Sequence, residues 1–229
     1  MNKKALFIGI GAALVIFFGY LAYQQWGDKP QLVTYKEPSL TAEARAIYEQ
    51  RLSEAQKAVA EINDQTPAEE KFNRYMALGS AKFSLGFYLD AKNAYQQALE
   101  VMPNNAFAWQ AQSTTLTAMG DYKGALNAIK KAISLDPKQA DFWKWQIDLE
   151  KDHFQANSDR VDELYGEALS KTDNNINIIT AYATFLEQTG DLEGALEQWQ
   201  KAYEVNTAQR EVYQAEIDRL QRRLEKLLK

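Results

Sequence analysis

The stretch Gly-Asp-Tyr-Lys-Gly-Ala at residues 120–125 has a near copy at residues 190–195, which reads Gly-Asp-Leu-Glu-Gly-Ala. A looser copy at residues 86–91 also begins with glycine and ends with alanine. The three copies start at positions 86, 120 and 190, so the first step is 34 and the second is 70, which equals 34 + 36. Glycine followed by aspartate is typical of a helix end followed by the N-cap of the next helix. The spacing therefore predicts a repeated pair of helices.

Alanines downstream of these copies keep the same spacing. Each precedes a large apolar residue, and a fourth lies between the last two copies. These four alanines are Ala98, Ala132, Ala168 and Ala202, whose numbers rise in steps of 34, 36 and 34. Small residues let two helices approach closely, and nearby aromatic rings fill the remaining space.

This pattern resembles the tetratricopeptide repeat (TPR), in which each repeat of about 34 residues forms two antiparallel helices. The resemblance divides the chain into four repeats, at residues 72–105, 106–139, 140–175 and 176–209. It implies an all-α fold, a TPR-type α-solenoid whose helix-turn-helix repeats wind into a right-handed superhelix. The third repeat departs most, because it carries two extra residues, lacks the turn glycine and has Val161 at a small position. We expect its helix pair to be longer or differently angled.

The segment from residue 5 to residue 23 predicts a transmembrane helix. Its nineteen residues carry no charge, and a helix of that length spans about 28 Å, close to the hydrocarbon thickness of a bilayer. Lys3 and Lys4 in residues 1–4 place this side in the cytoplasm. The repeats are then extracytoplasmic, in a single-pass protein of the cell membrane. A cleaved signal peptide is the alternative, but no pair of small residues two apart follows the apolar run.

The regions flanking the repeats have distinct patterns. Residues 24–40 hold two prolines and scattered charges and predict a linker. Residues 41–66 have apolar residues at helical spacing and predict an N-terminal capping helix, before a TPR domain at residues 67–209. Residues 210–229 predict a C-terminal capping helix. A solenoid needs a polar outer face at its ends; dimerisation through these helices, giving a homo-oligomer, is the alternative.

The composition disfavours catalysis and metal binding. The chain has no cysteine and a single histidine, His153, which excludes thiolate metal sites, iron–sulfur clusters and cysteine nucleophiles. It contains no phosphate-binding glycine loop and no nucleophile elbow. We therefore expect no enzyme activity, catalytic residue, metal or cofactor. The net charge of −5 becomes −5 − 2 = −7 without Lys3 and Lys4, which argues against nucleic acid as a partner.

The candidate site is a peptide-binding groove. In TPR proteins the first helix of each pair lines the concave face, and the resemblance implies a set of groove positions here. They are Asn73, Met76, Ser80, Phe83, Phe107, Gln110, Thr114, Asp141, Trp145, Asp148, Asn177 and Thr184. Amide and hydroxyl side chains can pair with the backbone of an extended peptide, while rings supply apolar pockets. The Lys and Asn clamp that some family members use for a terminal carboxylate is absent at the matching positions.

The expected function is a membrane-tethered, non-enzymatic scaffold or adaptor at the bacterial envelope, which binds a protein or peptide partner through the groove. The lipid bilayer is a second partner, through residues 5–23. Two alternatives remain open, namely a self-associating structural protein of the cell envelope and an accessory subunit of a membrane enzyme complex.

Overall fold

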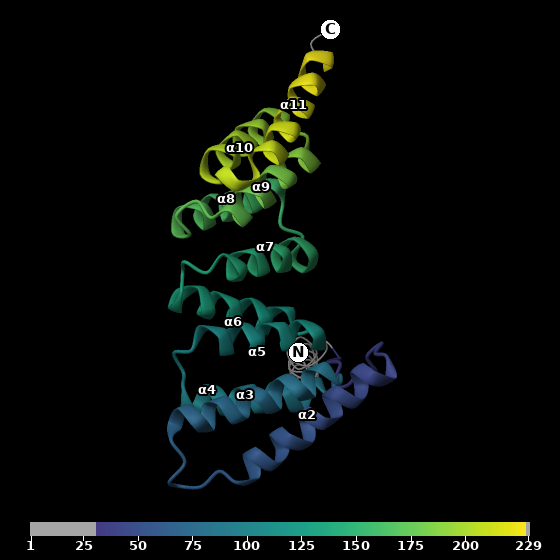
Figure 1. Ribbon diagram of the computed structural model, residues 1–229, viewed down its shortest axis with the longest axis vertical. Helices are drawn as coiled ribbons and strands as arrows, with labels where there is room; N and C mark the ends of the chain where they lie inside the picture. The colour runs from purple at the N-terminus through teal and green to yellow at the C-terminus, as the bar shows by residue number, and fades with distance from the viewer. Residues whose placement is uncertain (1–30, 228–229) are drawn as a thin grey trace, which may run out of the picture.

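The computed structural model describes residues 31–227, which are all-α. Ten α-helices and one short 3-10 helix follow one another along this part of the chain. They are α2 (Ala42–Ala60), α3 (Ala68–Ser84), α4 (Tyr88–Val101), α5 (Ala106–Met119), α6 (Tyr122–Leu135), α7 (Ala140–Phe154), α8 (Ser158–Lys171), α9 (Ile176–Thr189), α10 (Leu192–Val205), η1 (Thr207–Gln209) and α11 (Arg210–Leu227). The helices stack along one long axis, with α2 at one end and α11 at the other (Figure 1).

The predicted transmembrane segment at residues 5–23 lies outside the described residues, as do residues 1–4 and 24–30. Within residues 31–227, no helix is both long and apolar enough to cross a bilayer.

Small buried residues mark where the two helices of a repeat cross. The Ser113 hydroxyl on α5 donates to the Ala125 carbonyl on α6 at 2.8 Å, and both residues are fully buried. The equivalent pairs in the other repeats are Gly79 with Ala91, Ile147 with Val161, and Ala183 with Ala195. A Cβ added at Gly79 would lie 2.6 Å from the Tyr95 ring, so even alanine does not fit there without a shift. Three of the four crossings therefore use only small residues.

The turns within the repeats confirm the predicted glycine and aspartate roles. Gly120 ends α5 in the left-handed conformation, with φ of 83°, which glycine adopts without steric cost. Asp121 then caps α6 by accepting a hydrogen bond from the Gly124 N–H at 2.9 Å. In the third repeat, Gln155 takes the left-handed position instead, with φ of 51°. The helix α7 has 15 residues, against 17 in α3 and 14 in α5 and α9, so the third repeat does not have the longest first helix.

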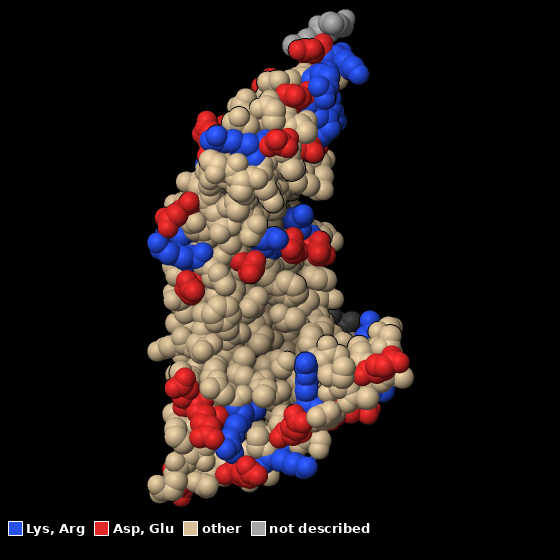
Figure 2. Space-filling view, in the orientation of Figure 1, with Lys and Arg blue, Asp and Glu red and all other residues tan. Residues whose placement is uncertain are grey.

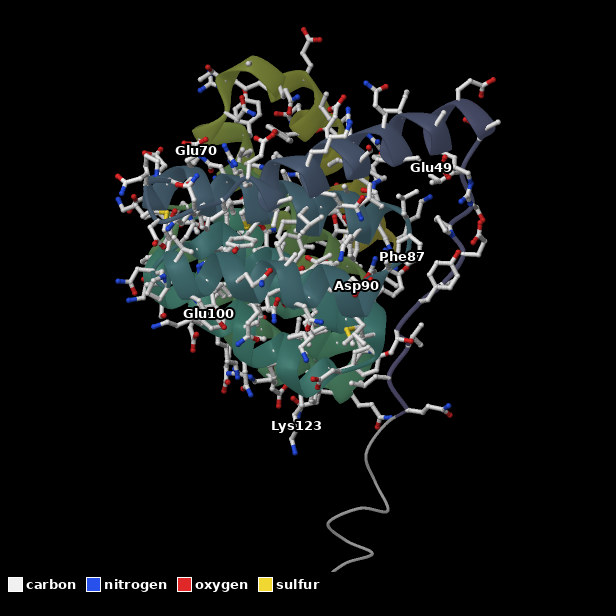
Figure 3. The ribbon with its side chains drawn as sticks, turned by 90° about the horizontal axis from the view of Figure 1, so that it is seen from below. Glu49, Glu70, Phe87, Asp90, Glu100 and Lys123 are labelled. Carbon is white, nitrogen blue, oxygen red and sulfur yellow. The ribbon has the colours of Figure 1, made fainter. Side chains whose placement is uncertain are left out.

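Residues 31–40 form an extended strap across the turns of the first two repeats (Figure 3). The Val33 N–H donates to the Met119 carbonyl at 2.9 Å, and the Lys36 N–H donates to the Gly86 carbonyl at 3.1 Å. The Leu89 N–H in turn donates to the strap at the Thr34 carbonyl, at 3.1 Å. The strap thus connects the end of α5 to the turn between α3 and α4 before α2 begins.

Candidate functional site

The predicted groove positions lie on α3, α5, α7 and α9, the first helices of the four repeats. Two contacts show that α5 and α7 lie side by side. The Trp145 indole N–H donates to the Ser113 hydroxyl at 3.0 Å, and the ring of Phe107 meets that of Phe142 edge-on, with centroids 5.4 Å apart. These contacts bring Phe107 and Trp145, the aromatic groove positions of the second and third repeats, to the boundary between α5 and α7.

The middle of this face, on α5, is uncharged. The fourteen residues of α5 read AFAWQAQSTTLTAM and contain no acidic or basic side chain. Figure 2 shows an uncharged area on the face in view, between a band of charged residues near mid-height and the charged residues at the α2 end. Phe107 is 53% exposed, and Gln110 and Thr114 are half-buried. Because the Thr114 hydroxyl donates to the Gln110 carbonyl of its own helix, Phe107 and the Gln110 amide are the groups most available to a ligand.

On α3 the predicted residues divide between packing and exposure. Met76 packs against the core cluster around Phe72, and the Phe83 ring lies 5.4 Å from the Tyr88 ring. Asn73 and Ser80 are exposed. The Ser80 hydroxyl, however, hydrogen-bonds with the buried Tyr95 on α4, so Asn73 is the predicted position on α3 with the fewest contacts to the core.

On α7, Trp145 serves mainly as a contact between repeats, because its indole N–H is used by the buried Ser113. Asp141 and Asp148 are exposed residues. Partial burial of its carboxyl raises the pKa of Asp148, and the charge of Lys151 acts in the opposite direction. On the neighbouring α8, burial raises the pKa of Tyr165 to about 12, and the charge of Asp148 adds to this rise.

On α9, Asn177 and Thr184 are exposed. The Thr184 hydroxyl donates to the Thr180 carbonyl one turn earlier, at 2.9 Å. Thr184 also lines a cavity of about 490 Å³ with residues of α10 and α11, among them Trp199 and Arg219.

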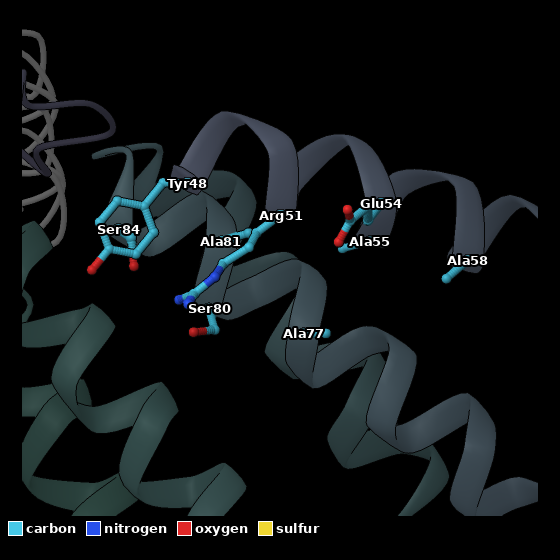
Figure 4. Close-up of a pocket in the computed structure, with 9 residues that line it drawn as sticks. All are labelled: Tyr48, Arg51, Glu54, Ala55, Ala58, Ala77, Ser80, Ala81 and Ser84. Carbon is cyan, nitrogen blue, oxygen red and sulfur yellow. The ribbon is translucent and has the colours of Figure 1, made fainter. Parts of the chain in front are cut away.

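A second cavity, of about 400 Å³, lies at the opposite end of the stack between α2 and α3. Tyr48 and Arg51 on α2 point toward Ser80 and Ser84 on α3 (Figure 4). The Arg51 guanidinium lies 5.6 Å from the centre of the Tyr48 ring. Tyr48 and Arg51 are not among the predicted groove positions, because the family pattern does not cover the helix that carries them. An arginine one turn after a tyrosine on that helix was the available signal.

The helix α11 closes the other end. It buries Tyr213, Ile217 and Leu220, and its Arg219 guanidinium contacts the Glu187 carboxylate on α9 at 2.7 Å. Glu187 also accepts a hydrogen bond from the Trp199 indole at 3.0 Å. The apolar side of α11 is thus covered within the chain from Tyr213 to Leu220, whereas Leu227 at its end is 71% exposed.

No group of three or more His, Cys, Asp or Glu side chains in residues 31–227 is arranged to hold a metal ion. His153 is exposed, and its ring stacks on Tyr122 with centroids 3.6 Å apart. The buried Glu150 accepts hydrogen bonds from Gln146 and Arg160, so its carboxylate is engaged in contacts between helices.

Comparison with known proteins agrees with this architecture. The sequence profile of the tetratricopeptide repeat family matches residues 72–105 and 108–139. A crystal structure of MamA is 17% identical, covers 76% of this chain and 94% of its own, and superposes with a TM-score of 0.55. A MamA RS-1 ArsTM double mutant is 21% identical, covers 72% of this chain and 88% of its own, and has a TM-score of 0.53. MamA 41-end from Desulfovibrio magneticus RS-1 is 19% identical, covers 72% of this chain and 89% of its own, and has a TM-score of 0.52. No curated protein sequence matches the chain significantly.

Proposed function

On an all-α helical repeat fold of the TPR type, we propose that this protein is a membrane-tethered scaffold that binds a protein or peptide partner. The groove runs along α3, α5, α7 and α9, and the apolar segment at residues 5–23 is the tether. The repeats lie on the extracytoplasmic side of a cell membrane, and Lys3 and Lys4 lie on the cytoplasmic side.

The uncharged face of α5 is the observation that carries the groove proposal. An acidic protein with a net charge of −5 leaves a half-exposed ring, Phe107, beside the Gln110 amide in the centre of this face. A ring can anchor an apolar side chain, and amide groups can pair with the backbone of an extended segment. The partner segment is therefore extended and weakly charged, with at least one apolar side chain.

A photo-crosslinking amino acid at position 107 tests the groove in intact cells. The matched control is position 127, because Asn127 is exposed on α6, the second helix of the same repeat. We expect position 107 to capture a discrete partner and position 127 to capture none. Capture at 127 with none at 107 would contradict the groove.

Binding of the captured partner then tests the ring. Phe107→Ala should weaken affinity about tenfold or more, as truncation of an aromatic anchor does. Phe154→Ala is the control, because Phe154 is also a partly exposed ring but lies at the end of α7, outside the predicted groove positions. Equal affinities of the two variants would contradict a binding role for Phe107.

The tether is tested separately by topology. The chain has no native cysteine, so Ser134→Cys introduces one exposed thiol into the TPR domain. We expect a membrane-impermeant maleimide to label it in spheroplasts without lysis, and alkaline carbonate to leave the protein in the membrane fraction. Labelling only after lysis would contradict the orientation, and extraction by carbonate would contradict the tether.

A further inference from the structure

The strap and the turn beside it carry a group of exposed apolar side chains. Tyr35 and Phe87 form its centre, with ring centroids 5.1 Å apart. We call the group the strap patch; its members, between 37% and 45% exposed, are Leu32, Val33, Tyr35, Phe87 and Leu89. Three of the five come from the strap, and the other two come from α4 and its N-cap.

The strap patch is held in place by backbone contacts. Three hydrogen bonds fasten residues 33–36 to the turns, as described above. At Gly86 a Cβ would lie 1.8 Å from the Lys36 carbonyl oxygen, whereas a Cβ at the equivalent Gly120 would meet nothing within 4 Å. The strap thus sits directly on the backbone of the first turn. Its apolar side chains are exposed on a fastened segment, which presents them as a defined surface.

The position of the strap along the chain limits what can cover the patch. Leu32 is nine residues after Tyr23, the last residue of the proposed tether. Nine extended residues reach at most about 30 Å. The patch therefore lies within about 30 Å of the bilayer surface whenever the tether is inserted, and the bilayer is the one apolar phase that is always within reach.

The chemistry of the patch fits the bilayer interface. Tyrosine and other aromatic side chains favour this region, where an apolar ring meets a hydrated layer. Two ion pairs lie around the patch, Glu37 with Arg45 and Lys82 with Asp90 at 3.8 Å, and Lys36 adds one exposed positive charge within the strap. An apolar surface with two ion pairs and a single additional lysine at its rim suits phospholipid headgroups, whose phosphates can accept from Lys36, better than a strongly charged partner.

We infer that the strap patch rests on the membrane surface and turns the edge of the first two repeats toward the bilayer. This inference rests on the proposed membrane tether. The contact would set the orientation of the whole solenoid, because the strap is fastened to two successive repeats.

A fluorescent probe at position 89 tests the contact in the full chain. Since the chain has no native cysteine, Leu89→Cys can be labelled uniquely with an environment-sensitive dye and reconstituted into phosphatidylcholine vesicles. Val205→Cys is the matched control, because Val205 is also exposed and apolar but lies at the end of α10. We expect spin-labelled phosphatidylcholine to quench the dye at 89 strongly and the dye at 205 not at all.

Flotation of the same vesicles separates the two proposals. If the protein floats and aqueous iodide quenches both positions equally, the strap-patch inference is overturned while the tether stands. If the protein does not float, both the membrane tether and the membrane contact of the strap patch are contradicted. Shielding at 89 that appears only when another protein is added, without quenching by lipid, also overturns the inference.

Two further variants guard against a local effect of the label. A dye at Leu32→Cys should be quenched by lipid in the same way as the dye at 89. Adding Tyr35→Ser and Phe87→Ser to the Leu89→Cys chain should abolish quenching at 89 and leave flotation and helix content unchanged. Retained quenching in that variant would show that the patch does not make the contact.

Discussion

Repeats two (residues 106–139) and three (residues 140–175) share a helix-pair plan but hold their helices together differently. In repeat two, α5 crosses α6 at Ser113 and Ala125, and a hydrogen bond of 2.8 Å joins the two helices through the serine hydroxyl. In repeat three, the equivalent residues Ile147 and Val161 are equally buried but much larger. Small residues let backbones touch, while branched residues fill a wider gap with side chains.

A polar network accompanies the wider crossing of repeat three. Glu150 on α7 is only 8% exposed. It accepts hydrogen bonds from the Gln146 amide at 2.8 Å and from the Arg160 guanidinium on α8 at 3.3 Å, and Lys130 on α6 lies 3.8 Å away. Three helices thus meet at one carboxylate. A repeat can therefore lose the small-residue pattern and still pack into the stack through larger side chains and charged contacts.

The largest expected effect comes from emptying the crossing of repeat three. Ile147 is fully buried in the main core, so Ile147→Ala should lower the free energy of unfolding by about 2–5 kcal/mol. Urea titration of the full chain in mild detergent measures this. Ile47→Ala is the control, because Ile47 is exposed on α2 and its loss should have little effect. A loss below about 1 kcal/mol at position 147 would mean that α7 and α8 are not packed through this residue.

Placing in repeat two the valine that repeat three has at the equivalent position should lower the free energy of unfolding by a smaller amount. Ala125→Val inserts two methyl groups where a hydroxyl already joins the helices, and we expect a loss of about 1–3 kcal/mol from overpacking. The same titration measures it, with Ala46→Val on the exposed face of α2 as the control for helix propensity. If Ala125→Val matches that control, the distinction between close and wide crossings is wrong.

A smaller effect is expected on the pH dependence of the free energy of unfolding, through Glu150 of repeat three. Burial alone would raise the pKa of Glu150, but hydrogen bonds from Gln146 and Arg160 and the nearby positive charges outweigh it and lower the pKa below its ordinary value of 4.5. A lowered pKa in the folded state stabilises the protein above pH 4.5, and this stabilisation is lost as the pH falls below that value. Arg160→Met should therefore cost about 1 kcal/mol at neutral pH, after allowance for solvent screening at the partly exposed arginine.

The difference between wild type and Arg160→Met should shrink as the pH falls from about 6 to about 3, because protonated Glu150 no longer needs the cation. Glu150→Gln provides the matched test, because it removes the titrating carboxyl and should weaken the dependence of stability on pH over the same range. A constant difference across this pH range would show that Arg160 acts through packing alone.

The fold was largely predictable because its determinants repeat. Small residues that recur once in each repeat and the glycine-aspartate turns are local signals, and the family profile and the structure agree on the repeats that carry them most clearly. The Glu150–Arg160 contact was not predictable, because it crosses the irregular turn of repeat three, where the pattern gives no register. The strap was not predicted for another reason: the hydrogen bonds that fasten it to the turns are made by backbone groups, which leave no side-chain signature.

The helix that carries each predicted groove position was predictable, but the role of its side chain was not. The family pattern places a residue on the first helix of a pair, yet it does not say whether that side chain faces a ligand or the next repeat. Phe107 and Trp145 illustrate this, because both are aromatic groove positions. Phe107 remains half-exposed, whereas the Trp145 indole is bound to Ser113, a residue 32 positions away in the sequence.

The smallest expected effect concerns the turns. Repeat two uses Gly120 at φ of 83°, and repeat three uses Gln155 at φ of 51°. The left-handed conformation costs a residue with a Cβ about 1–2 kcal/mol of folding free energy. Replacing it with glycine removes this cost, but part of the gain is lost because glycine has greater conformational freedom in the unfolded chain. Gln155→Gly should therefore stabilise the protein by about 0.5–1 kcal/mol, seen as a higher urea midpoint with an unchanged slope.

Gly120→Ala is the reverse change, and it measures the free-energy cost of placing a residue with a Cβ in the left-handed conformation. A Cβ at Gly120 would meet no other atom within 4 Å, so its cost of about 1 kcal/mol reports the backbone conformation alone. If Gly120→Ala destabilises as expected but Gln155→Gly also destabilises, the glutamine side chain must contribute a contact worth more than the strain it causes. The turn of repeat three would then be stabilised by side-chain contacts, as its helix crossing is, and the difference between the two repeats would extend from the core to the surface.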